Sequence, residues 1–247
     1  MNSKEIEQMI ISRRNDKQRE ILMRFFRTSP GEYGEGDEFL GLKVPETRAI
    51  VKQARLSVPF DDISRLLDSK WHEIRLAALL LLVEEMNAAL PHKRDNDEAV
   101  KAKSQRREDI ARFYLDHARR ANNWDLVDLS CEFVLGPYIY LSGNYEILSA
   151  LAMSDNLWEQ RIAVVTTFYF IRKGLWKPTF DICDMLLGHK HDLIHKAMGW
   201  MMREVGKRDR DALIGYLESR LKRLPRTTLR YAIERFPAIE RNSWLKR

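Results

Sequence analysis

The stretch HEIRLAALLLLVEEM, residues 72–86, decides the fold class because similar segments recur along the chain. Its counterparts are WEQRIAVVTTFYFIR at 158–172, LIHKAMGWMMREV at 193–205 and TTLRYAIERF at 227–236. Each segment places a basic residue at or just before an apolar run centred on an alanine, and these alanines are Ala77, Ala163, Ala197 and Ala232. Small residues at such positions let paired helices approach closely.

The spacing of the four alanines predicts a repeat. Their separations are 86, 34 and 35 residues, and the first is close to two periods of about 43. Helix pairs that recur every roughly 35 to 47 residues are typical of HEAT-type α-solenoids. Helical periodicity is found almost everywhere else, and no segment alternates as a strand does. We therefore predict an all-α fold, an α-solenoid of HEAT-like repeats in a single domain (1–247), curved with a concave basic face.

Prolines and an aromatic residue mark the starts of several helices. Apolar spacing before residue 27 predicts one or two N-terminal helices, and residues 28–37, with three glycines and one proline, form the clearest loop. The expected helix starts are at Pro45, Pro59, Trp71, Pro178 and Pro225.

Composition limits the class of protein. The 247 residues are 45% hydrophobic, enough for a core, and carry a net charge of +6. That charge is compatible with binding nucleic acid, and equally with solubility alone. The two cysteines form no metal or disulfide pattern. The N-terminus is too polar for a signal peptide, and no apolar run approaches the roughly 20 residues that cross a bilayer. We expect a cytoplasmic monomer with no membrane partner.

The run Asn122-Asn-Trp-Asp-Leu-Val-Asp128 holds the main candidate site residues. A helix that starts at Asn123 would project Trp124 and Asp128, four residues apart, from one face. An indole beside a carboxylate can grip a cationic group or stabilise developing positive charge. Asp125 points elsewhere and is expected to serve the helix N-terminus.

Three later segments supply cations and a second tryptophan. Arg161 follows a helix cap, while Lys196, Trp200 and Arg203 share one helical face by their spacing. Arg230 lies in the last repeat. Guanidinium and ammonium groups of this kind can bind a phosphate backbone while the indoles face a nucleotide.

Each of these residues also has an ordinary structural interpretation, which spacing alone favours. The tryptophans can be core anchors, Asp128 a cap or an i,i+4 partner, and the arginines ion-paired within the stack. Gly199 would then mark a close helix contact. His191 and His195 have metal-ligand spacing but no carboxylate in the usual arrangement, so no metal site is expected. Phosphate-loop and serine-nucleophile motifs are both missing.

Four motifs together resemble the AlkD-like DNA alkylation-repair glycosylases, a family of HEAT-like repeats. They are FLGLKVPxxR at 39–48, WDLVD at 124–128, DNLWEQR at 155–161 and KAMGWxxRE at 196–204. They occur in the family's order and span most of the chain. The resemblance favours functional roles for Trp124, Asp128, Arg161 and Trp200.

The resemblance implies a monofunctional glycosylase, without cofactor or metal, that excises purines alkylated at N3 or N7 from duplex DNA. Asp128 would stabilise oxocarbenium-like charge and orient or deprotonate the attacking water. Trp124 and Trp200 would line the lesion's backbone, and Arg161 would hold a phosphate or orient Asp128. Backbone contacts would come from Arg203, Lys196, Arg48 and Arg230. Members of the family engage the lesion from the backbone side without a dedicated base pocket.

Two other functions stay open at this point. One is a non-catalytic protein of the same fold that binds damaged or distorted DNA, and the other is a protein-interaction scaffold. Only DNA binding would weaken steeply as salt rises. The loop at 30–38 departs from the family in its length and acidity, and it leaves the N-terminal contribution undefined.

Overall fold

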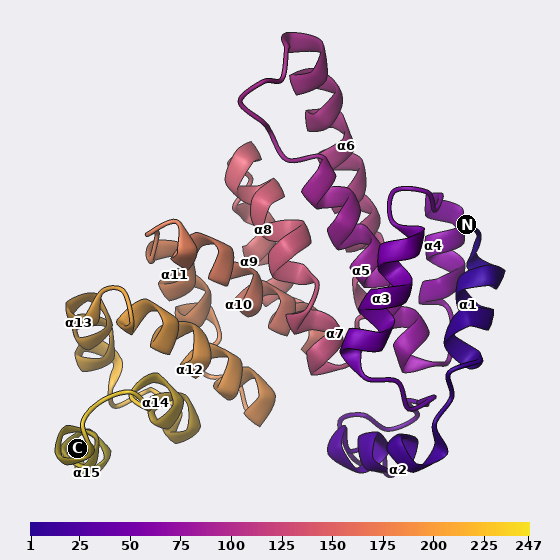
Figure 1. Ribbon diagram of the computed structural model, residues 1–247. Coiled ribbons are helices and arrows are strands. Elements are labelled where there is room, and N and C mark those ends of the chain that lie inside the picture. The colour runs from indigo at the N-terminus through magenta and orange to yellow at the C-terminus, as the bar shows by residue number, and fades with distance from the viewer. The chain divides into compact units, whose positions relative to one another are not determined.

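The computed structural model describes residues 1–247 and is all-helical, with fifteen α-helices, one short 3-10 helix and no strand (Figure 1). Glu38 and Trp71 form an isolated parallel β-bridge outside any strand. The predicted all-α fold is therefore confirmed. The chain divides into two compact units, residues 1–134 and 135–247. None of the helices combines the length and apolar character that a bilayer-spanning helix needs.

The N-terminal unit is organised around its long apolar helix α5. Helix α5 packs against α1, α3, α4, α6 and α7. Residues on every side of α5 are buried, including Ala77 and the run of four leucines from Leu79, which explains why this segment is apolar all round. The helices of this unit are α1 (Ser3–Ile11), α2 (Asp16–Phe25), α3 (Val44–Ala54), α4 (Phe60–Leu67), α5 (His72–Ala88), α6 (Asp97–Asp116), η1 (Ala118–Arg120) and α7 (Trp124–Asp128).

Helix α8 (Cys131–Ser142) crosses the boundary, and the rest of the C-terminal unit is a succession of paired helices. Helix α10 packs on α9, α11 and α12, and α12 packs on α13 and α14. Pairing between near neighbours in the chain is the pattern of an α-solenoid. The bounds are α9 (Glu146–Ala152), α10 (Leu157–Arg172), α11 (Lys177–Met185), α12 (Asp192–Gly206), α13 (Arg210–Arg220), α14 (Arg226–Ala232) and α15 (Ala238–Lys246).

The five expected helix starts agree with the structure. Pro45 and Pro178 lie in the first turns of α3 and α11, where a missing N–H costs nothing. Pro59, Trp71 and Pro225 are the N-cap residues of α4, α5 and α14. The N-terminal apolar pattern resolves into two helices, α1 and α2.

Gly199 is a close packing contact between α12 and α14. A Cβ atom at this position would lie 2.4 Å from the Cβ of Tyr231 and 2.6 Å from the backbone oxygen of Thr228. The neighbouring Ala197 is fully buried, as are Ala77 and Ala163 of the earlier repeats. The small residues of the repeat therefore mark places where helices meet.

We expect Gly199→Ala to destabilise the protein by roughly 1–3 kcal/mol, because the added methyl group would overlap a backbone oxygen. Gly215→Ala in α13 is the matched control, since a Cβ there meets nothing within 4 Å. It should stabilise the protein by about 0.5–1 kcal/mol through helix propensity alone. Urea unfolding of both variants measures the difference, and equal midpoints would contradict the packing argument.

Candidate active site

Helix α7 places Trp124 and Asp128 beside one cavity. The helix begins after Asn123, whose Oδ1 accepts a hydrogen bond from the N–H of Trp124 at 2.8 Å. Trp124 and Asp128 are both half-buried and line a cavity of about 440 Å³ within the N-terminal unit. The four-residue spacing thus gives them a common face, while Asp125 also reaches the cavity wall from the first turn.

Aromatic rings form much of the cavity wall. Trp124 stacks on Phe26 with ring centroids 5.2 Å apart and meets the edge of Phe25 at 5.8 Å. Phe26 stacks in turn on Phe39 at 5.1 Å. Phe25, at the end of α2, is 61% exposed, which is unusual for phenylalanine. The indole of Trp124 therefore belongs to an aromatic cluster that is partly open to solvent.

A buried histidine at the wall of this cavity connects two carboxylates. His72 Nδ1 lies 2.7 Å from Asp37 Oδ2, and His72 Nε2 lies 2.9 Å from Asp125 Oδ2. All three side chains are almost completely buried. Burial alone would lower the pKa of His72, but the charges and hydrogen bonds of Asp125 and Asp37 outweigh it and raise that pKa to about 9. His72 is therefore an imidazolium at neutral pH.

Asp37 receives two further donors. Arg75 Nη2 donates to Asp37 Oδ1 at 2.5 Å, and Asn123 Nδ2 donates to Asp37 Oδ2 at 3.0 Å. Burial would raise the pKa of Asp37, but His72 and Arg75, with Asn123, hold it below its usual value. Asn123 thus joins the N-terminus of α7 to the loop that precedes α3.

Glu73 holds the next part of that loop. Its carboxylate accepts the backbone N–H groups of Leu40 at 2.9 Å, Gly41 at 2.7 Å and Leu42 at 3.1 Å. Gly41 has a φ of +95°, and a Cβ there would lie 2.1 Å from the backbone oxygen of Asn15. A glycine is required here for both reasons.

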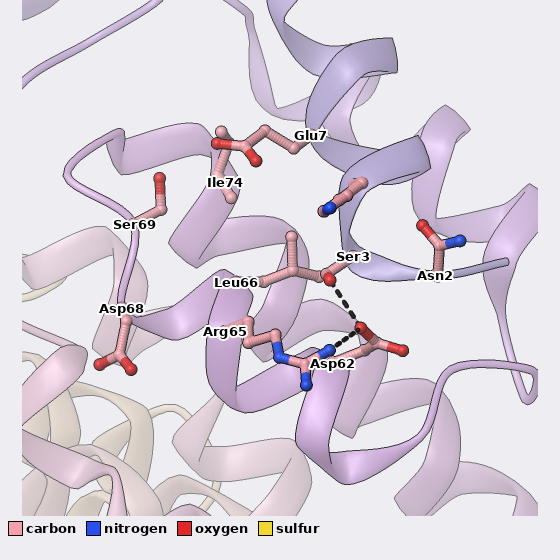
Figure 2. A pocket seen from close by; sticks show the side chains of 10 residues that line it. Asn2, Ser3, Glu7, Asp62, Arg65, Leu66, Asp68, Ser69 and Ile74 are labelled. Atoms are coloured by element: carbon pink, nitrogen blue, oxygen red, sulfur yellow. Dashed lines mark hydrogen bonds and ion pairs between the residues drawn. The ribbon is translucent and has the colours of Figure 1, made fainter.

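A larger cavity of about 690 Å³ lies between α1, α4 and α5 (Figure 2). Three of its polar groups bond to one another: the Ser3 hydroxyl donates to Asp62 Oδ1 at 2.6 Å, and Arg65 Nη1 donates to the same oxygen at 3.1 Å. Figure 2 shows Ser3 and Arg65 converging on Asp62. Because its wall lacks the aromatic groups of the smaller cavity, we do not take it as the candidate site.

Arg161 and Trp200 lie in the C-terminal unit. Arg161, in the first half of α10, is only 5% exposed and donates from Nη1 to the backbone oxygen of Leu193 at 2.7 Å. It thereby ties α10 to the start of α12. Asn156 caps α10, in agreement with the expected cap at residues 155–156.

Trp200 is half-buried on α12 and belongs to a cluster of rings and guanidinium groups. Its ring meets the edge of Phe168 with centroids 5.8 Å apart. The guanidinium carbons of Arg172 and Arg208 lie 4.5 Å and 5.9 Å from the centroid of the Phe168 ring. A cation over an aromatic face is electrostatically favourable. This cluster joins two aromatic rings to two exposed arginines.

The four expected DNA-binding cations fall into two groups. Arg203 forms an ion pair with Glu234, and Lys196 Nζ lies 2.8 Å from Asp192 Oδ2. Arg48 and Arg230 are exposed on α3 and α14.

The three histidines near α12 contact protein groups. His189 Nε2 lies 2.9 Å from Gln160 Oε1, and His195 Nε2 lies 2.5 Å from the backbone oxygen of His189. The side chain of His191 accepts the N–H of Leu193 as the helix cap. No group of three or more His, Cys, Asp or Glu side chains is arranged to hold a metal ion.

Fold and site together define a class: a helical-repeat protein whose candidate residues are a carboxylate, two indoles and several guanidinium groups. Within that class the chain belongs to the DNA alkylation repair enzyme family, whose model matches residues 6–236. This confirms the resemblance inferred from the four sequence motifs.

A solved structure has the same fold. It is described as a predicted DNA alkylation repair enzyme from Enterococcus faecalis, and it matches with a TM-score of 0.65 at 16% sequence identity. The match covers 91% of this chain and 97% of the other. At this identity the likeness concerns the fold alone. No functionally curated protein matches the sequence significantly.

Several residues of the site were not among the sequence candidates. The most important are His72, Asp37 and Arg75, which form the buried network, and Phe25 and Phe168, which extend the two aromatic clusters. A histidine directly after a helix cap, followed three residues later by an arginine, was the available signal for the network. Asp37 itself lies in the acidic loop at 30–38.

We expect Glu73→Gln to destabilise the protein by roughly 1–3 kcal/mol, because the new amide NH₂ would face a buried backbone N–H. The matched control is Glu108→Gln, which removes only an exposed i,i+4 pair with Arg112. Its effect should stay within about 0.5 kcal/mol. Urea unfolding tests both, and equal effects would show that the three N–H bonds contribute little.

Proposed function

We propose that this protein is a monofunctional DNA glycosylase that hydrolyses the N-glycosidic bond of N3- or N7-alkylated purines in duplex DNA, without a cofactor. Membership of the DNA alkylation repair enzyme family supports a role in alkylation repair. The observation that carries the finer proposal is the pair Trp124 and Asp128, which share one cavity on one face of α7.

The pair suits the chemistry of a cationic leaving group. Alkylation at N3 or N7 makes the purine positively charged, so it departs with the electron pair of the C–N bond and needs little acid catalysis. Positive charge then develops on the deoxyribose. The carboxylate of Asp128 opposes that charge and accepts a proton from the attacking water, while the π face of Trp124 adds a further favourable electrostatic contact.

Duplex binding is proposed to use the cations of both units. Lys196 and Arg203 are held by carboxylates in the free chain, and a phosphate can replace those partners. Arg48 and Arg230 are exposed and can reach phosphates directly. The Trp200 cluster offers ring faces together with the guanidinium groups of Arg172 and Arg208.

Arg161 is proposed to support catalysis without contacting much of the duplex. It is 5% exposed and bound to the Leu193 backbone, so it presents little surface to a phosphate. Its proposed role is therefore to hold the start of α12, the helix that carries Lys196, Trp200 and Arg203, against α10.

Asp128→Asn should slow the release of 7-methylguanine from a methylated duplex by roughly 10²- to 10⁴-fold, because the amide neither opposes positive charge nor accepts the proton. Duplex affinity should change little. The measurement is single-turnover base release together with binding of unmethylated duplex. Asp61→Asn, which changes an exposed carboxylate on α4, is the control and should behave as the wild type.

Equal release by the wild type and Asp128→Asn would contradict the assigned role of Asp128. If neither protein releases base, yet both bind duplex tightly with strong salt dependence, the non-catalytic DNA-binding function replaces the glycosylase.

Arg203→Ala should weaken binding to methylated and unmethylated duplex by the same factor and reduce the salt slope by about 1, because one phosphate contact is lost. Glu234→Gln should not weaken binding, because it removes only the carboxylate that competes with phosphate for Arg203. Both are measured by titration of duplex at several salt concentrations. A loss confined to methylated DNA would show instead that Arg203 senses the lesion.

A further inference from the structure

Helix α7 depends on its surroundings for its orientation. It has only five residues, and an isolated helix of that length is not stable in water. Trp124 and Asp128 lie on the face that lines the cavity, and Asp125 connects the helix to the buried network. Whatever fixes Asp125 therefore also fixes the direction in which Trp124 and Asp128 point.

The fixing group is the ring of His72. Both ring nitrogens lie within hydrogen-bonding distance of carboxylate oxygens, at 2.7 Å from Asp37 and 2.9 Å from Asp125. An ionised carboxylate can only accept, so both nitrogens must donate. A neutral imidazole has one donor and would turn a lone pair toward one of the two anions. The geometry therefore requires the imidazolium.

The charges around His72 balance. The charged groups around it are Asp37 from the loop before α3, Arg75 and Glu73 from α5, and Asp125 from α7. The two positive and two negative groups of the network compensate each other, while Glu73 is satisfied by three backbone N–H groups.

Two further features make Asp125 depend on its hydrogen bond with His72: aromatic rings cover the His72 ring, and one oxygen of Asp125 has no hydrogen-bond partner. The rings of Phe39 and Phe26 lie 4.3 Å and 5.1 Å from the His72 ring and exclude water from it. The second oxygen of Asp125, Oδ1, is buried and has no hydrogen-bond partner. Without the donor at Nε2, the Asp125 carboxylate would be left as an uncompensated buried charge.

We infer that His72, as an imidazolium, is a positioning residue that holds α7 so that Asp128 and Trp124 face the reacting sugar. The inference rests on the proposed glycosylase function and adds a role for His72, the first residue of α5. The side chain of His72 is only 2% exposed, and both of its ring nitrogens are engaged by Asp37 and Asp125. Its effect on the reaction passes through Asp125.

The inference gives base release a dependence on pH. Because the folded-state pKa of His72 is raised from 6.5 to about 9, its contribution is complete below pH 6.5 and is lost as pH rises through about 9. In Asp125→Asn one of the two anions that raise this pKa is gone, while the amide oxygen can still accept the hydrogen bond. The alkaline loss should therefore move to lower pH in that variant.

The experiment is single-turnover release of 7-methylguanine from a methylated duplex over a series of pH values, after subtraction of spontaneous release. Circular dichroism at each pH confirms that the protein is folded. Wild-type release should fall with a midpoint near pH 9. Asp125→Asn should show the same fall at lower pH, and His72→Gln should release base slowly with duplex affinity unchanged and no fall in this range.

His117→Gln is the matched control. His117 is also stacked on a phenylalanine, Phe113, at 4.2 Å, but its ring nitrogens meet the Ser64 hydroxyl and the Phe113 backbone oxygen. Its profile should coincide with that of the wild type. An unshifted midpoint in Asp125→Asn, or an unchanged rate in His72→Gln, would overturn the inference.

A second readout separates this inference from the proposed function. The fluorescence of Trp124, taken as the difference between the wild type and Trp124→Phe, should change with the same alkaline midpoint and shift in Asp125→Asn. If the wild type releases no base at any pH, the proposed function fails, and this fluorescence decides the inference. A signal that is flat across the series would overturn it.

Discussion

The rest of the N-terminal unit depends on a buried balance of charge among Asp37, His72, Arg75 and Asp125. Removing one member of such a set leaves an uncompensated charge in the interior, at a cost of several kcal/mol. The four residues come from a loop, the start of α5 and α7, so these segments must assemble together. Apolar burial along α5 brings the segments near one another, and the charges then determine their exact alignment.

Helix α7 shows how a site can be both precise and accessible. Asp125 and the Asn123 cap attach it to the interior, and Trp124 and Asp128 line the cavity. A reactive group held on a short element with a rigid base keeps its geometry better than one on a flexible loop. The C-terminal unit uses a different solution, because Trp200 is set among arginines on long helices.

The sequence predicted those features that have a period or a local spacing. The repeated alanines indicated the helical fold, and the gap between Trp124 and Asp128 indicated a shared face. For the charge network the sequence offered only the local spacing of His72 and Arg75, because Asp37 and Asp125 lie 35 and 53 residues from His72 and polar contacts between distant segments leave no periodic pattern. Asp125 was expected to interact with the N-terminus of its own helix, and it does lie in the first turn of α7. Its hydrogen bond with His72 joins residues 53 positions apart and could not be predicted from local spacing. Phe25 belongs to the apolar spacing that predicted the N-terminal helices, and it is 61% exposed although its ring meets the rings of Phe26 and Trp124.

Helix α2 carries one further consequence. None of its ten residues is buried, and its ends are tied down mainly by the Asn15 N–H bond to Leu40 and by the rings of Phe25 and Phe26. Segments with so little buried surface exchange their amide hydrogens through local opening at a small fraction of the global free energy of unfolding. We therefore expect the wall that α2 contributes to open at a lower free energy than the wall formed by α5 and α7, so that the width of the opening can change while Trp124 and Asp128 keep their positions.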